Sequence, residues 1–93
     1  MACTPFTLTV KDVKAAVAKV KKAIGEQKGT FTGDENSGAF SFSGSGLITG
    51  KYAIQGGYKV AGQAITITID IKAERPAVVS CKAVEERVRE WLK

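Results

Sequence analysis

The sequence predicts an α+β domain in which an antiparallel sheet of four to five strands packs one face against two helices, in the order β-α-β-β-β-β-α. Amphipathic helical patterns lie near both ends of the chain. Between them, residues 29–73 are rich in Gly, Ser, Thr, aromatic and β-branched residues, which is typical of strands joined by tight turns. The 93 residues fit one α+β domain spanning 1–93.

The first strand is expected at Phe6–Val10, where apolar residues alternate with threonines. Thr9 and Asp12 then match a capping box, in which both side chains satisfy free amides at a helix start. The helix that follows gathers its apolar residues on one arc and its lysines on the other, and Gly25 supplies a C-terminal stop.

The central segment is expected to form a meander with one apolar face. Gly56 and Gly57 are expected to form a hairpin turn, because both accept positive φ. In the last strand four isoleucines alternate with Thr and Asp, so they are expected to face the helices. The four expected strands are Gly29–Gly33, Ala39–Ser43, Leu47–Gln55, and a longer one that runs from the Gly56-Gly57 turn to Lys72.

The closing helix is expected to begin at Ser80, a residue type that caps helix N-termini, after Pro76 has ended the last strand. Glu85 and Arg89 are spaced for an ion pair on its exposed side. Its apolar arc holds Cys81, Val84, Val88, Trp91 and Leu92.

Charge and cysteine content indicate a partner class and a compartment. Lys and Arg number 14 against 9 acidic residues, and the net charge of +5 favours anionic partners. Cys3 and Cys81 are too few to staple a secreted scaffold, so both are expected to be free thiols. The N-terminus lacks the regions of a signal peptide, and no apolar stretch approaches the ~20 residues of a membrane span. These features predict a cytoplasmic protein.

Most catalytic and metal-binding chemistry is missing from the sequence. Without His, no Ser, Thr or Cys has the usual neighbouring base, and a closed zinc site cannot be built from two isolated cysteines. The glycines of Gly44–Gly46 and Gly50 lack the spacing of a nucleotide-binding loop. The chain is therefore expected to be non-enzymatic, with no cofactor and no metal.

The first functional hypothesis is a hydrophobic ligand held between sheet and helices. The competing interpretation is that the same side chains are plain core, because so small a chain has little apolar volume to spare for a pocket of ~300 Å³ or more. The candidate lining residues are Phe40, Phe42, Tyr52, Ile54, Ile67 and Trp91.

Two further hypotheses stay open. One is an anion-binding face on the first helix, whose alternative is a merely solvated helix back; nucleic acid is disfavoured because Phe40 and Phe42 are expected to face inward rather than to stack on bases. The other is a homodimer formed through an exposed strand edge. The candidate anion-binding residues are Lys11, Lys14, Lys19, Lys21 and Lys22.

Several segments together resemble a known family, the polyhydroxyalkanoic acid system (granule regulation) proteins. They are Ala39–Gly46, Gly50–Ile54, Ile65–Ile71, Pro76 and Val84–Leu92. The resemblance implies a small bacterial cytoplasmic accessory protein whose partner is a hydrophobic small molecule or a polyester granule. It brings no catalytic or ligand signature, and the His that members often carry before the first helix is absent here.

Overall fold

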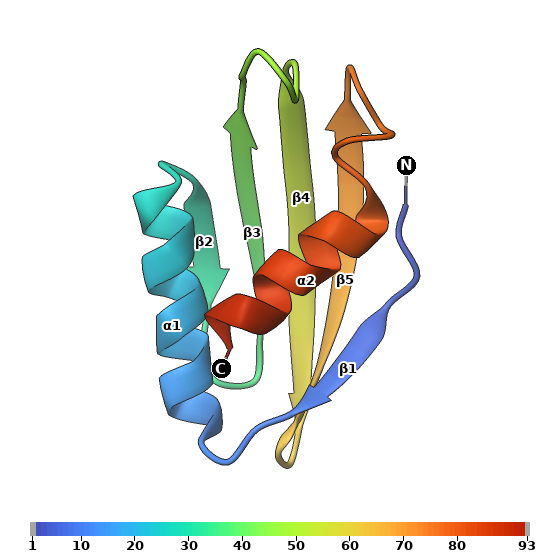
Figure 1. Cartoon of the computed structure of the whole chain (residues 1–93). Coiled ribbons are helices and arrows are strands. Elements are labelled where there is room, and N and C mark those ends of the chain that lie inside the picture. The colour runs from blue at the N-terminus through green and yellow to red at the C-terminus, as the bar shows by residue number, and fades with distance from the viewer. Residues whose placement is uncertain (1, 93) are drawn as a thin grey trace.

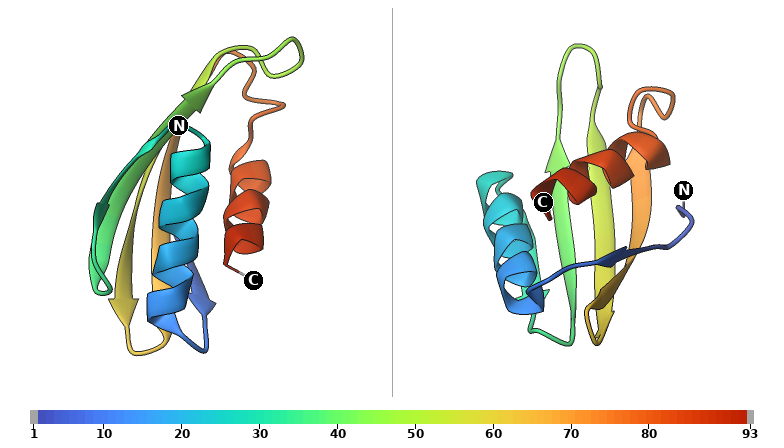
Figure 2. Two further views of the ribbon diagram at one scale, coloured as in Figure 1. Left: turned by 90° about the vertical axis from the view of Figure 1, so that its left-hand side faces the viewer. Right: turned by 60° about the horizontal axis from the view of Figure 1, so that its bottom comes forward.

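A curved antiparallel sheet forms one layer and two helices lie on its concave face, as Figures 1 and 2 show. The structure is a computed structural model that describes residues 2–92. It confirms the expected α+β class and element order. The elements are β1 (Phe6–Thr9), α1 (Val13–Glu26), β2 (Thr30–Gly33), β3 (Ser37–Gly44), β4 (Tyr52–Ala61), β5 (Ala64–Ala73) and α2 (Cys81–Trp91).

The five strands lie in the order β1-β5-β4-β3-β2, and each pair is antiparallel. The last four strands form a simple meander, whereas β1 adds to its far edge with Phe6 opposite Ile67 and Leu8 opposite Ile65. The connection between β1 and β2 therefore passes over the concave face, and α1, which is part of it, runs alongside β2 and β3 (Figure 1). The two longest strands, β4 and β5, lie at the centre of the sheet.

The core lies between the inner face of the sheet and the helices. All four isoleucines of β5 are buried, as the alternation predicted, and each contributes about 1.5–3 kcal/mol of hydrophobic stabilisation. α1 adds Ala16, Val20 and Ile24, and α2 adds Val84 and Val88. The two helices therefore share one core.

The helix starts are set by single side chains. Ser80 caps α2 as predicted, its Oγ accepting the backbone N–H of Ala83 at 3.2 Å. α1 differs from the prediction: its cap is Asp12, whose Oδ1 accepts from the backbone N–H of Ala15 at 3.1 Å. The capping box was wrong because Thr9 is still held in β1, opposite Ala64.

The expected Gly56-Gly57 turn was also wrong, because both glycines lie inside β4. The hairpin turn follows Ala61 and contains Gly62, with φ of +63°. Gly56 has another purpose: a Cβ there would lie 2.5 Å from Cζ of Phe40, which sits opposite on β3. The glycine makes room for the buried aromatic ring.

The strand expected at Leu47–Gln55 begins only at Tyr52. Leu47 and Ile48 instead form the tip of the β3–β4 loop, where they are 96% and 74% exposed. Ile48 therefore lies outside the sheet and does not contribute to its inner face, where Ile54 is buried.

Cys3 and Cys81 form a disulfide, so the expectation of two free thiols was wrong. The N-terminal segment continues along the edge of β5, where the backbone N–H of Cys3 donates to the carbonyl of Ile69 at 2.8 Å. Cys81 is the first residue of α2 and arrives over the same edge, which brings the two Cα atoms to 5.5 Å. A separation of 78 positions hid this proximity.

Reduction of this disulfide is expected to lower the free energy of unfolding by about 2–4 kcal/mol, because it releases a constraint on a long loop of the unfolded chain. Denaturant titrations with and without a reductant measure the change. The double variant Cys3→Ser/Cys81→Ser should unfold like the reduced protein and should not respond to the reductant. A wild-type midpoint that is insensitive to reductant would contradict the bridge.

Gly56→Ala is expected to destabilise the fold by about 2 kcal/mol, because the added Cβ must displace the buried Phe40 ring. Gly25→Ala is the matched control: no atom lies within 4 Å of its added Cβ, and the change in the last turn of α1 should stabilise by about 0.5 kcal/mol. Thermal unfolding measures both. Equal effects of the two variants would show that the close approach to Phe40 is unimportant.

Candidate functional site

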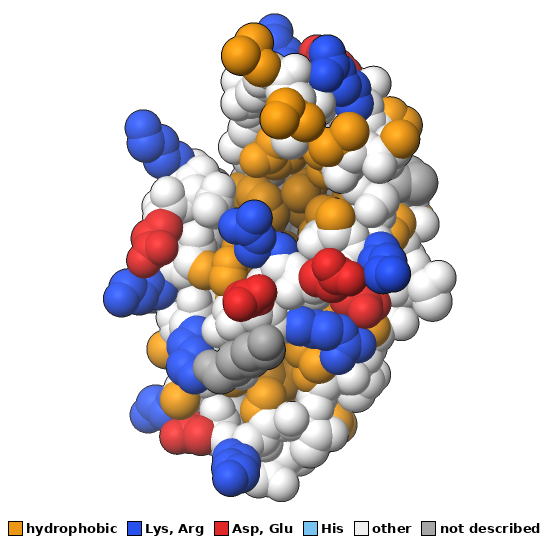
Figure 3. All heavy atoms as spheres, viewed as in Figure 1, with side chains coloured by type: hydrophobic (Ala, Val, Ile, Leu, Met, Phe, Trp, Pro, Cys, Tyr) orange, Lys and Arg blue, Asp and Glu red, His pale blue; other side chains and the backbone are white. Residues whose placement is uncertain are grey.

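One hollow of the described structure is an apolar groove of about 170 Å³. It lies between α2, the adjoining ends of β3 and β4, and the C-terminal end of α1 (Figure 3). We call it the α2 groove. Its apolar lining residues are Phe42, Tyr52, Ile54, Val78, Val79, Ala83, Val84, Val88 and Trp91.

The sheet wall of the α2 groove is built by strand register. Phe42 of β3 lies opposite Ile54 of β4, so both side chains point to the concave face. Tyr52 lies opposite Gly44, and a Cβ at that glycine would be 2.5 Å from the phenol oxygen of Tyr52. The missing side chain lets the tyrosine ring lie flat across β3 and form the end of the wall.

The helix wall comes from α2 and the segment before it. Trp91 meets Phe42 edge to face, with ring centroids 5.7 Å apart, and this contact ends the groove near the C-terminus of α2. Val84 and Val88 form the floor, where the groove meets the buried core. The walls are therefore fixed by core packing.

Three polar residues complete the lining: Gln27, Thr49 and Arg87. Arg87 is exposed, and within residues 2–92 no carboxylate forms an ion pair with it. Its neighbour Arg89 is committed elsewhere, since it bonds Glu85 at 3.1 Å, as the spacing predicted, and lies over the ring of Phe6. Arg87 thus offers a free cation beside an apolar hollow, an arrangement that suits an apolar group ending in an anion.

Four of the six side chains proposed from the sequence come together in this groove: Phe42, Tyr52, Ile54 and Trp91. Phe40 and Ile67 do not, because they are buried in the core with Val88 and Leu92, around a separate space of only about 10 Å³. Arg87 and Val79 were missed. Helical spacing does place Arg87 beside Val84, one turn further along α2. The prediction considered only apolar residues of the helix and so did not include it.

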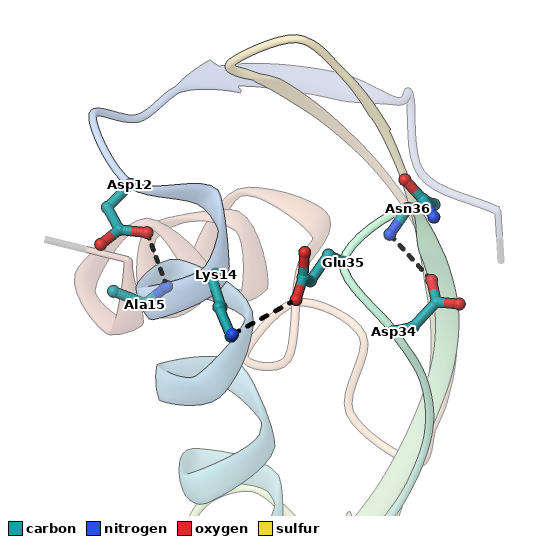
Figure 4. A network of polar contacts seen from close by, with 6 residues as sticks. All are labelled: Asp12, Lys14, Ala15, Asp34, Glu35 and Asn36. Atoms are coloured by element: carbon teal, nitrogen blue, oxygen red, sulfur yellow. Dashed lines mark hydrogen bonds and ion pairs between the residues drawn. The ribbon is translucent and has the colours of Figure 1, made fainter.

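The five lysines proposed as an anion-binding face are all exposed, and they lie apart from the α2 groove. Lys14 points from the first turn of α1 toward the β2–β3 turn, where its Nζ lies 3.8 Å from a carboxylate oxygen of Glu35 (Figure 4). Such an exposed pair contributes little stability. The other four lysines make the exposed side of α1 and the segment before it basic.

Within residues 2–92 two groups have shifted pKa values. One is Asp34 in the β2–β3 turn, and the other is Tyr58 on β4, whose side chain contacts that turn at the opposite end of β3 from the groove. The backbone N–H of Asn36 donates to the carboxylate of Asp34 (Figure 4), as does the backbone N–H of Ser37, and both bonds lower the pKa of Asp34. Burial raises the pKa of Tyr58, and the charge of Asp34 adds to this effect. The Tyr58 hydroxyl donates to the Asp34 carbonyl at 2.6 Å, so these shifts reflect how the turn is held.

Across residues 2–92, no group of three or more His, Cys, Asp or Glu side chains is placed to hold a metal ion. Neither helix in that span is long and apolar enough to cross a bilayer. Compared with protein-family models, with curated proteins and with solved structures, the chain has no significant match. The resemblance to polyhydroxyalkanoic acid system proteins therefore stays a prediction.

Proposed function

We propose that this protein is a non-enzymatic binding protein that holds a small apolar ligand with a carboxylate end in the α2 groove. The observation that carries the proposal is the combination of an apolar hollow with the guanidinium of Arg87 on its rim, which forms no ion pair with any carboxylate of residues 2–92. Burial of the ligand's apolar part supplies affinity at roughly 25 cal/mol per Å². A charged hydrogen bond to Arg87 orients the other end.

The size of the groove sets the size of the ligand. A volume of about 170 Å³ is below the ~300 Å³ at which drug-sized pockets begin. An engineered apolar cavity of about 150 Å³ in another protein takes benzene, which has six carbons. The α2 groove therefore suits an acyl chain of about that length, whereas a long fatty acid would extend into solvent.

A short acyl or hydroxyacyl acid also agrees with the resemblance to proteins linked with polyester granules, whose monomers are of this chemical class. The cytoplasmic location that the resemblance implies remains a prediction. The disulfide removes one of the observations that supported this location, the assignment of two free thiols, since disulfides persist mainly in oxidising compartments.

Hexanoate is expected to bind and to change the fluorescence of Trp91, which lines the groove and is the single tryptophan of the sequence. Ala83→Leu, on an exposed position that lines the groove, should fill it and weaken binding at least tenfold. Ala18→Leu makes the same exchange on the exposed side of α1, outside the groove, and should leave binding unchanged. Equal loss in both variants, or no uptake by native mass spectrometry, would refute the proposal.

The role of Arg87 is tested with the same probe. Arg87→Gln should weaken hexanoate binding several-fold and leave hexanol binding nearly unchanged, because the alcohol has no charge to pair. Lys82→Gln removes one positive charge from the same helix outside the groove and is the control. A similar loss for both variants would indicate a general effect of charge.

A second candidate function is the binding of an anionic partner by α1, favoured by the exposure of all five lysines on and before that helix. Binding to a polyanion such as heparin should then weaken steeply with added salt, because counterions are released on association. Lys14→Gln/Lys21→Gln should weaken it, and Lys51→Gln/Lys72→Gln, with the same loss of charge at another place, should not. Equal effects would show that only the net charge matters.

A further inference from the structure

The tip of the β3–β4 loop is the most apolar exposed feature of the described structure. Leu47 and Ile48 are 96% and 74% exposed, and Val78, on the connection between β5 and α2, is 43% exposed. Both loops lie at the same end of the molecule (Figure 1). In Figure 3 hydrophobic side chains continue from this end into the α2 groove. We call Leu47, Ile48 and Val78 the apolar tip.

The loop is held in a form that keeps these side chains outside. Gly46 and Gly50 exchange two backbone hydrogen bonds, of 2.9 and 3.3 Å, that close its base. Nη1 of Arg75 donates to the carbonyls of both Leu47 and Ile48, at 2.9 Å each. The two carbonyls thus face Arg75 on the protein side of the loop, and the side chains of Leu47 and Ile48 lie on the solvent side.

Three cations lie close to the base of the β3–β4 loop. Lys51 follows the loop, Lys72 lies near it on the outer face of the sheet, and Arg75 lies beneath it; Glu74 is the carboxylate among them. Three positive charges against one negative charge give this end a positive field. Exposed apolar side chains with Lys and Arg near their base suit a surface with an apolar interior and anionic headgroups.

We propose that the apolar tip docks on an anionic phospholipid surface, with Leu47 and Ile48 inserted among the acyl chains and Lys51, Lys72 and Arg75 at the headgroups. A folded protein partner fits the tip less well, since a stable interface buries ~800 Å² on each side and a convex tip of three residues offers far less. A second copy fails for the same reason. A lipid surface needs no complementary shape, so two inserted side chains and nearby cations suffice for reversible binding.

This site is separate from the proposed ligand site, although Thr49 and Val78 connect them by lining the α2 groove from the same two loops. Docking would bring the groove close to the lipid interface. The docking proposal does not depend on ligand binding, and each can fail alone.

Co-sedimentation with vesicles of phosphatidylglycerol and phosphatidylcholine in equal parts tests the proposal. Wild type is expected to bind these vesicles and to bind pure phosphatidylcholine much less. Leu47→Ser/Ile48→Ser should weaken binding at least tenfold, because each inserted side chain contributes a large share of the affinity. The same variant should still take up hexanoate, which separates this result from failure of the α2 groove.

Variants that remove lysine charges distinguish binding through the apolar tip from binding through α1. Lys51→Gln/Lys72→Gln should weaken binding to the anionic vesicles, whereas Lys14→Gln/Lys21→Gln should change it little. Full retention of binding by Leu47→Ser/Ile48→Ser, or a greater loss in the α1 variant than in the tip variant, would overturn the proposal.

Insertion itself is read from fluorescence. In a Trp91→Phe background, Leu47→Trp should shift its emission to the blue on adding anionic vesicles, because the indole leaves water for the acyl region. Ala18→Trp in the same background places the probe on the exposed side of α1 and should not shift. A probe at position 47 that stays unshifted while the protein sediments with the vesicles would refute insertion.

Discussion

Two short helices must cover one long apolar sheet face, and the rest of the architecture depends on how they share that task. The ten-residue strands β4 and β5 each extend about 33 Å, at ~3.3 Å per residue. The eleven residues of α2 extend about 16 Å, at 1.5 Å per residue, and α2 lies obliquely across these strands (Figure 1). It buries Val84 and Val88 against the isoleucines of β5, but it is too short to cover the end of the sheet where β3 and β4 are joined by their loop. The α2 groove is the part of the apolar face that remains uncovered.

Glycines under aromatic rings decide the shape of the face that the helices meet. Phe40 lies against Gly56, and Tyr52 lies against Gly44, each in the space that a side chain would occupy. The rings can therefore lie close against the sheet backbone, which leaves room for α2 above them. The same arrangement of an aromatic ring over a glycine therefore occurs at two places along β3. The ring of Phe40 is buried in the packed core, whereas the ring of Tyr52 is left partly open and forms a wall of the groove.

Local periodicity predicted the parts of the fold that periodicity controls. The alternation in β5 gave its buried face, and Ser80 gave the start of α2. Errors occurred where local chemistry has two uses. The Gly56-Gly57 pair is typical of a hairpin turn, but here Gly56 lies in a strand and makes room for the ring of Phe40 on the neighbouring strand. Leu47 is a residue type typical of strands, but here it lies in a loop whose backbone is held by Arg75, a residue 28 positions away. Four residues of the groove could be predicted because the sequence pattern shows which side chains face the core. The extent of the groove could not, because it depends on where α2 lies across the sheet, and no local pattern encodes that position.

The α2 groove is preorganised because its helical wall is held at both ends and in the middle. At the N-terminal end, Cys81 is bonded to Cys3, and the backbone N–H of Cys3 donates to Ile69 on the edge of β5. Val88 is fixed in the core, and Trp91 packs on Phe42 at the far end. A wall tied at three points loses little freedom when a ligand binds, which favours affinity for a small molecule. It also cannot move aside for a larger one, so the same packing that closes the core limits the groove to ligands of short apolar chain.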